Sequence, residues 1–248
     1  MTVHFIGAGP GAADLLTLRA ARLLATSPVC VYAGTYVTAD VLEHCPPGAE
    51  LVDSQHLNLD DITAVLVRAD RAGQDVARLC SGDPSIYSAV AEQTRRLDGA
   101  GVPWDVTPGV PAYAAAAALL GRELTVPEVA QTVILTRAQA RSTRMPEGEQ
   151  LSRLAASGAT LVLHLAITRM RAVAEELAPV YGADCPVAVV HRATAPDEQV
   201  LRGTLADIAN QVERLGLRQA AVILVGRVLT AQGFVDSHLY ASRRSPAG

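Results

Sequence analysis

The sequence predicts an α/β protein made of two α/β domains, and two observations lead to this prediction. Short apolar segments alternate with stretches of helical periodicity along most of the 248 residues, which is the pattern of strands and helices that build a layered sheet. Three apolar segments of the first half run directly into glycine-containing loops, at residues 7–11, 81–84 and 107–111. In an open parallel sheet such loops line one crevice at the carboxyl ends of the strands, where ligands bind.

The first half predicts one doubly wound, mostly parallel sheet, in a domain of residues 1–117. Thr17 is placed to cap one helix and Asp83, just before Pro84, to cap another. A plain capped turn is the alternative explanation of the second loop, but the design shared by three loops favours a ligand site. The strands are expected at residues 3–6, 29–32, 50–52, 75–80 and 104–106, and the helices at residues 18–25, 60–72, 88–97 and 112–120.

The second half repeats the alternation with less glycine and predicts a mixed sheet with helices, in a domain of residues 118–241. Residues 198–203 are short and polar, which is typical of an antiparallel edge strand. The tail of residues 242–248 is expected to be disordered. The other strands are expected at residues 132–136, 159–165, 186–190 and 220–225, and the helices at residues 147–157, 168–181 and 205–215.

The composition disfavours several classes of protein. The longest apolar run, residues 112–120, is shorter than the roughly 20 residues that span a bilayer, and the first residues lack the basic region of a signal peptide. The net charge is −4 and there is no basic tail, which disfavours a nucleic-acid partner. We therefore expect a cytoplasmic protein with neither a membrane nor a nucleic acid as its partner.

Cysteine and histidine show no metal-binding pattern. Cys30, Cys45, Cys80 and Cys185 are scattered without a C-x-x-C pair, and the six histidines show no H-x-x-x-H pair. We therefore expect reduced, mostly buried thiols and no metal site. All 21 basic residues are arginine, so a lysine that binds phosphate, forms a Schiff base or acts as a general base is excluded.

The first glycine loop formally matches a dinucleotide-binding fingerprint, with Gly7, Gly9 and Ala12 at the fingerprint spacing. The helix that should follow at once is delayed, however, and the second strand ends in Ala33 and Gly34, where a carboxylate should bind the ribose. The loop therefore predicts close backbone contact with a ligand. The carboxylate that would bind the ribose is absent, which disfavours a nicotinamide-dependent oxidoreductase.

Four segments, in order, resemble the signatures of the tetrapyrrole methylases, the class III S-adenosylmethionine-dependent methyltransferases. They are Gly-Ala-Gly-Pro-Gly at residues 7–11 with Asp-Leu-Leu-Thr at 14–17, Ser-Gly-Asp-Pro-Ser-Ile-Tyr at 81–87, Thr-Pro-Gly-Val at 107–110, and residues 192–205. The resemblance covers residues 3–228. Within the family, residues 32–34, 121–134 and 136–137 resemble the methyltransferases that act on corrin precursors in cobalamin biosynthesis.

The resemblance implies a homodimer of chains with two α/β domains each, and S-adenosylmethionine folded into a pocket between the domains. The uroporphyrinogen methyltransferases of the family carry an acidic residue soon after the second strand, proposed as a base. Here residues 33–36 read Ala-Gly-Thr-Tyr, so no catalytic base can be transferred. Carried over position by position, the cofactor contacts are Pro10, Ser81, Gly82, Asp83, Ile86, Pro111, Ala112, Leu165 and Ala193.

Arginines are the candidates for substrate binding, because the resemblance implies a tetrapyrrole substrate that carries acetate and propionate carboxylates. Arg137, Arg141 and Arg144 follow a strand that is expected to end at the ligand crevice, and guanidinium groups suit carboxylates. The alternative is a solvated loop whose arginines only keep the surface soluble.

The function expected from the resemblance is C-methylation of a corrin precursor with S-adenosylmethionine as the donor. Methyl transfer from a sulfonium depends mainly on positioning, which close backbone contacts can supply. Methylation of another tetrapyrrole carbon is an alternative, and so is a non-catalytic tetrapyrrole carrier, which would not bind S-adenosylhomocysteine. Relatives that act on ribosomal RNA or on a protein histidine are disfavoured, because no basic surface with interleaved aromatic residues is present. The sequence leaves open whether the substrate carries cobalt.

Overall fold

The computed structural model describes residues 1–138 and 144–237, which divide into two compact units. Unit 1 comprises Met1–Ala115 together with Arg192–Asp197, and unit 2 comprises Ala116–His191 and the described residues from Glu198 onward. The boundary therefore falls inside helix α5 (Ala112–Leu120). The tail that the sequence predicts to be disordered lies outside the described residues.

Unit 1 contains one five-stranded sheet in which every neighbouring pair of strands is parallel. The parallel, doubly wound sheet expected from the first half of the sequence is thus confirmed. The strands are β1 (Val3–Gly7), β2 (Val29–Tyr32), β3 (Glu50–Asp53), β4 (Val76–Cys80) and β5 (Trp104–Thr107), in the spatial order β3-β2-β4-β1-β5.

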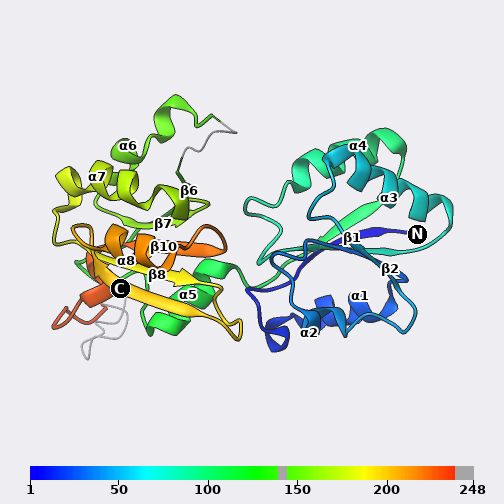
Figure 1. Ribbon diagram of the computed structural model, residues 1–248, viewed down its shortest axis with the longest axis horizontal. Coiled ribbons are helices and arrows are strands. Elements are labelled where there is room, and N and C mark those ends of the chain that lie inside the picture. Colours follow the sequence, from blue (N-terminus) through cyan, green and yellow to red (C-terminus); the bar gives the residue numbers. More distant parts are fainter. Residues whose placement is uncertain (139–143, 238–248) are drawn as a thin grey trace, which may run out of the picture. The chain divides into compact units, whose positions relative to one another are not determined.

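Helices cover both faces of this sheet, α1 and α2 on one face and α3 and α4 on the other (Figure 1). Successive side chains of a strand point to opposite faces, so Phe5 packs with the residues of α3 and α4 while Ile6 packs with those of α1 and α2. The helices are α1 (Leu18–Thr26), α2 (Ala39–Leu42), α3 (Leu59–Arg71) and α4 (Val90–Ala100), with a short 3-10 turn η1 (Ala13–Leu15) before α1.

One helix start is predicted correctly and another is wrong. The hydroxyl of Thr17 accepts a hydrogen bond from the backbone N–H of Ala20, as expected of the N-cap of α1. Asp83, by contrast, does not cap α4, which begins only at Val90. The two residues Tyr87 and Ala89 have φ of 55° and 54°, a left-handed conformation that interrupts a right-handed helix.

Unit 2 contains a mixed sheet, as the sequence predicts. Its strands are β6 (Val133–Arg137), β7 (Thr160–His164), β8 (Pro186–His191), β9 (Gln199–Thr204) and β10 (Ala221–Val225), in the spatial order β6-β7-β10-β8-β9. β6 and β7 are parallel and the other neighbours are antiparallel. β9 is an antiparallel edge strand, which confirms that prediction, and the last strand of the chain, β10, lies at the centre of the sheet.

One face of this sheet packs against the helices α6 (Leu151–Ala155), α7 (Met170–Tyr181) and α8 (Ile208–Leu215). Helix α6 is shorter than expected, because the predicted helical segment opens with a 3-10 turn and α6 proper spans five residues. Three short turns complete the described chain: η2 (Glu147–Glu149), η3 (Ile167–Arg169) and η4 (Arg227–Thr230). Among the described helices, none has both the length and the apolar composition needed to cross a bilayer.

A charged side chain, Arg78, is buried in unit 1, where 8% of its surface is exposed. Its Nε donates to Oε1 of Gln93 at 2.9 Å, and its Nη1 donates to the carbonyl of Leu79 at 3.0 Å and to that of Val31 at 3.4 Å. Burial lowers the pKa of this guanidinium below its usual value. The neutral acceptors therefore compensate the buried charge and join β4 to β2 and to α4.

We expect Gln93→Leu to lower the free energy of unfolding of unit 1 by about 1.5–3 kcal/mol, because a charged donor loses its buried acceptor. Urea unfolding followed by the fluorescence of Trp104, the only tryptophan of the chain, measures this unit. Glu92→Leu, at an exposed position of the same helix, is the control and should change stability by less than about 0.5 kcal/mol. Equal unfolding midpoints for the two variants would contradict the prediction.

Candidate functional site

The candidate site is organised where the loops after β1 and β4 meet. These adjacent strands lead to helices on opposite faces of the sheet, which is the topological switch point where open α/β sheets bind ligands. Gly82 donates its backbone N–H to the carbonyl of Gly9 at 2.8 Å, and Gly9 donates to that of Gly82 at 3.2 Å. The two loops are thus joined directly through their backbones.

The loop after β5 packs against the same point without any intervening side chain. A Cβ on Gly7 would lie 2.4 Å from the backbone nitrogen of Gly109, and a Cβ on Gly109 would lie 2.3 Å from the carbonyl oxygen of Gly82. Neither contact can be relieved by moving a flexible side chain, because both partners are backbone atoms. The spacing of glycines in the three loops therefore reflects a crossing of three backbones, which we call the loop crossing.

Asp83 fastens the second loop to the third. Its Oδ2 accepts a hydrogen bond from the backbone N–H of Gly109 at 2.8 Å, and its Oδ1 accepts from the backbone N–H of Ser85 at 2.8 Å and from the Ser85 hydroxyl. Partial burial acts to raise the pKa of Asp83, but these hydrogen bonds outweigh it and hold the pKa below its usual value. The carboxylate is therefore charged at neutral pH, with both oxygens occupied.

Two further segments of unit 1 hold the first loop. The hydroxyl oxygen of Thr194 accepts a hydrogen bond from the backbone N–H of Ala12 at 3.0 Å, and a Cβ on Gly11 would lie 2.8 Å from the carbonyl oxygen of Ala193. The hydroxyl of Thr38 donates to the carbonyl of Gly11 at 3.0 Å. The Arg192–Asp197 segment and the connection after β2 thus both contact the first glycine loop.

Backbone strain marks the same segments. Four of the seven described non-glycine residues with positive φ lie in or beside the four signature segments, and a fifth, Leu165, is a predicted cofactor contact. The four are Tyr87, Ala89, Arg192 and Thr194. Such conformations cost of order 1–3 kcal/mol each and cluster at functional sites, where the surrounding structure enforces them. No pattern in the sequence indicates these positions, because none of the residues is a glycine.

Most of the predicted cofactor contacts lie together in unit 1. Leu165 lies in unit 2 directly after β7, with a φ of 52° and 59% of its surface exposed. The contacts on the three loops are Pro10, Ser81, Gly82, Asp83, Ile86, Pro111 and Ala112, and Ala193 lies against the first loop.

The predicted substrate-binding arginines belong to unit 2 where they are described. Arg137 is the last residue of β6, and its Nη2 donates to the carbonyl of Arg144 at 3.5 Å. Arg141 lies outside the described residues. Within residues 1–138 and 144–237, no group of three histidine, cysteine or acidic residues is close enough to hold a metal ion.

Sequence reasoning missed one acidic residue. It found no carboxylate in the loop after the second strand, but Asp53, the last residue of β3, accepts a hydrogen bond from the backbone N–H of Gly34 in that loop at 3.0 Å. The pairing of β3 beside β2 brings the two together. An aspartate directly after a predicted strand is the only signal that could have indicated this contact.

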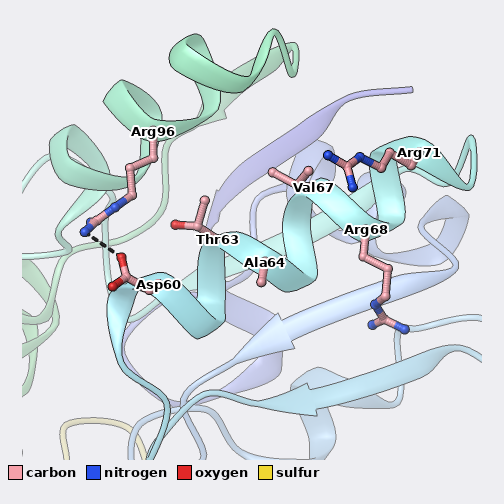
Figure 2. Close-up of a pocket in the computed structure, with 7 residues that line it drawn as sticks. All are labelled: Asp60, Thr63, Ala64, Val67, Arg68, Arg71 and Arg96. Atoms are coloured by element: carbon pink, nitrogen blue, oxygen red, sulfur yellow. Dashed lines mark hydrogen bonds and ion pairs between the residues drawn. The ribbon is translucent and has the colours of Figure 1, made fainter.

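A groove of about 400 Å³ lies on the outer surface of the helices α3 and α4 and contains none of the predicted site residues (Figure 2). Arg96 forms an ion pair with Asp60 there at 2.9 Å, and Arg68 pairs with Glu50. Its arginines are thus largely engaged with acidic neighbours. The groove is lined by Asp60, Thr63, Ala64, Val67, Arg68, Arg71 and Arg96.

Comparison with known proteins agrees with the motifs. The model of the Tetrapyrrole (Corrin/Porphyrin) Methylases matches residues 2–209. A precorrin-4 C(11)-methyltransferase of Rhodococcus erythropolis is 62% identical, over 98% of this chain and 98% of its own length. The solved structure of a cobalt precorrin-4 methyltransferase has a TM-score of 0.89 at 38% identity and covers 93% of this chain and 96% of its own.

A further solved structure, a uroporphyrin-III C-methyltransferase from Thermus thermophilus, is complexed with S-adenosylhomocysteine. It has a TM-score of 0.78 at 30% identity and covers 92% of this chain and 99% of its own. The family model and these relatives extend over nearly the whole chain, including all three glycine loops. The chain therefore belongs to the tetrapyrrole (corrin/porphyrin) methylase family, as its four ordered motifs predict.

Proposed function

We propose that this protein transfers the methyl group of S-adenosylmethionine to C11 of precorrin-4 in cobalamin biosynthesis. The observation that carries the proposal is the loop crossing, a close approach of three backbones in a chain that is 62% identical to a precorrin-4 C(11)-methyltransferase. Incubation of the purified protein with precorrin-4 and methyl-labelled S-adenosylmethionine should transfer the label to the tetrapyrrole. Binding of S-adenosylhomocysteine in calorimetry, which a mere tetrapyrrole carrier lacks, is the accompanying measurement.

The chemistry suits a site with few ionisable side chains. The positive sulfur of the donor already activates the methyl group, so the protein mainly has to hold a nucleophilic ring carbon in line with it. Positioning of this kind can supply about 7–11 kcal/mol in the best cases. Three backbones locked together by hydrogen bonds provide a rigid surface for that purpose.

We propose that the cofactor binds at the loop crossing, through the residues of unit 1 that the family resemblance indicates there. Leu165, which belongs to unit 2, stays a contact predicted from the family resemblance. Gly82 supports this assignment, because it has a φ of +66° and its missing Cβ would be 3.4 Å from the nitrogen of Ala112 and 3.5 Å from the Cα of Pro111. The space in front of Gly82 is thus bounded by two further predicted cofactor contacts.

We expect Gly82→Ala to weaken S-adenosylhomocysteine binding by more than about tenfold, or 1.4 kcal/mol, in a calorimetric titration. Gly73→Ala is the matched control, because Gly73 has a φ of +70° and nothing within 4 Å of its missing Cβ. Both variants bear a similar backbone strain, so only the ligand site differs. Equal affinity of the two variants for S-adenosylhomocysteine would remove the second loop from the cofactor site.

We propose that Arg137, with Arg141 and Arg144, binds carboxylates of the tetrapyrrole. Arg137→Ala should then raise the KM for precorrin-4 and leave kcat and cofactor affinity unchanged, the pattern of lost uniform binding. Arg153→Ala, at an exposed position of α6, is the control for a lost arginine in the same unit. An Arg137→Ala, Arg141→Ala double variant with the wild-type KM would reduce these arginines to surface residues.

We expect activity without a metal ion. Displacement at a sulfonium needs no Lewis acid, and the scattered cysteines and histidines offer no ligand set. Protein treated with EDTA and then desalted should methylate precorrin-4 at the rate of untreated protein. Loss of activity that a divalent ion restores would contradict this.

The metal state of the substrate can also be proposed. The 62% identical relative is named for precorrin-4, whereas the 38% identical solved structure is named for its cobalt form, so the metal-free substrate is favoured. Parallel assays with the two forms separate them. On the family resemblance we further propose a homodimer in the cytoplasm.

A further inference from the structure

The carboxylate of Asp53 contacts the loop that follows β2. Asp53 ends β3 and lies opposite Tyr32, the last residue of β2, in the parallel register. Its Oδ1 accepts hydrogen bonds from the backbone N–H groups of Gly34 at 3.0 Å and of Gln55 at 2.9 Å. The side chain is exposed, so it faces solvent at the carboxyl edge of the sheet.

Gly34 is what allows the carboxylate to come so close. A Cβ at this position would lie 2.6 Å from Oδ2 of Asp53, well inside van der Waals contact. Unlike the glycines of the tight turns, Gly34 does not have a positive φ, so its backbone conformation is open to other residues. The missing side chain therefore serves the contact with Asp53 and not the turn itself.

The Asp53 carboxylate is charged, and only one of its two oxygens accepts hydrogen bonds from the described residues. The two backbone amides, Gly34 first, lower its pKa below the usual value. Among the described residues no arginine forms an ion pair with it, and its Oδ2 accepts no hydrogen bond. Burial raises the pKa of the Tyr32 phenol, and the negative charge of Asp53 raises it further. A fixed negative charge thus has one oxygen free for a ligand.

The position of this oxygen connects it with the proposed methyl-transfer site. The segment after β2 is held by Asp53 through Gly34 and is held to the first glycine loop through Thr38 and Gly11. β3 lies two strand positions from β4, or about 10 Å at the usual strand spacing. Asp53 and the loop crossing therefore share the carboxyl edge of one sheet, which is where ligands bind in such folds.

We propose that the free oxygen of Asp53 is a catalytic group that accepts a hydrogen bond from a ring N–H of the bound tetrapyrrole and stabilises the positive charge that develops on that nitrogen. This inference rests on the proposed methyltransferase function. In this proposal the acidic residue comes from β3, because the loop after β2 contains none at residues 33–36.

Methyl transfer forms one bond and breaks one. The electron pair of the nucleophilic ring carbon forms the new bond to the methyl carbon, and the carbon–sulfur bond breaks with its pair going to sulfur, which becomes a neutral thioether. The ring nitrogen conjugated with that carbon takes up the positive charge, and its proton is then lost to water. A carboxylate with a lowered pKa is a weak base, so Asp53 acts through its charge and its hydrogen bond, as preorganised groups do in other enzymes.

The decisive variant is Asp53→Asn, because an asparagine keeps the Oδ1 acceptor for Gly34 and Gln55 but removes the charge. We expect kcat for precorrin-4 to fall by about 100-fold, the effect typical of losing one electrostatic stabiliser, with KM and S-adenosylhomocysteine affinity within about threefold of wild type. Asp40→Asn, at an exposed position of α2 in the same β2–β3 connection, removes the same charge and should leave kcat unchanged. If Asp53 had only a structural role, Asp53→Asn would have the wild-type kcat, and that result would overturn the proposal.

Gly34→Ala tests the same oxygen independently. The new methyl group should displace the end of the flexible Asp53 side chain without unfolding the loop, and kcat should fall as in Asp53→Asn. The two changes should not be additive, so Gly34→Ala in the Asp53→Asn background should reduce kcat little further. Additive losses would show that the alanine acts elsewhere and would contradict the proposed role.

A readout without turnover separates this proposal from the proposed function. In the full-length protein, the carboxyl carbon resonance of Asp53, assigned by its absence from Asp53→Asn, should move when precorrin-4 is added together with S-adenosylhomocysteine. A wild-type protein that methylates nothing refutes the proposed function, whereas this resonance still reports the contact. A resonance that does not move on saturation with the tetrapyrrole overturns the inference about Asp53.

Discussion

The loop crossing of three backbones is the constraint on which the rest of unit 1 depends. Gly9 and Gly82 exchange backbone hydrogen bonds, and Gly7 and Gly109 approach each other and Gly82 so closely that no side chain fits between them. This contact requires β1 to lie between β4 and β5, as it does in the sheet. The crossover helices of β1 and β4 leave toward opposite faces, an arrangement that marks the ligand-binding edge in open α/β sheets.

Much of the fold could be predicted because it depends on local patterns. The alternation of apolar strands and periodic helices indicates ten strands that the structure contains, and the glycines indicate the loops. The start of α4 could not be predicted, because Tyr87 and Ala89 adopt left-handed conformations that their residue types do not indicate. The Asp53–Gly34 contact was missed for a related reason, since it depends on which strands become neighbours.

Hydrogen bonds keep two carboxylates at the carboxyl edge of unit 1, those of Asp53 and Asp83, in the ionised form. The pKa of Asp53 is lowered by hydrogen bonds from two backbone N–H groups, and the pKa of Asp83 by hydrogen bonds from the Ser85 hydroxyl first and then from two backbone N–H groups. A carboxylate with a lowered pKa in the folded state stabilises the fold above its unfolded pKa, near 4, and this contribution is lost as the pH falls through the folded value. Neither group therefore titrates near neutral pH, and both carboxylates are charged there.

The two aspartates differ in what their oxygens have left to offer. Both side-chain oxygens of Asp83 are occupied by Gly109 and Ser85, so its carboxylate shapes the loop crossing and its proposed contact with the cofactor is left to its backbone. Oδ1 of Asp53 accepts hydrogen bonds from the backbone of Gly34 and Gln55, whereas its Oδ2 accepts none from the described residues. One residue type thus serves two purposes, and the hydrogen bonds already made determine which aspartate is architectural and which can act on a bound molecule.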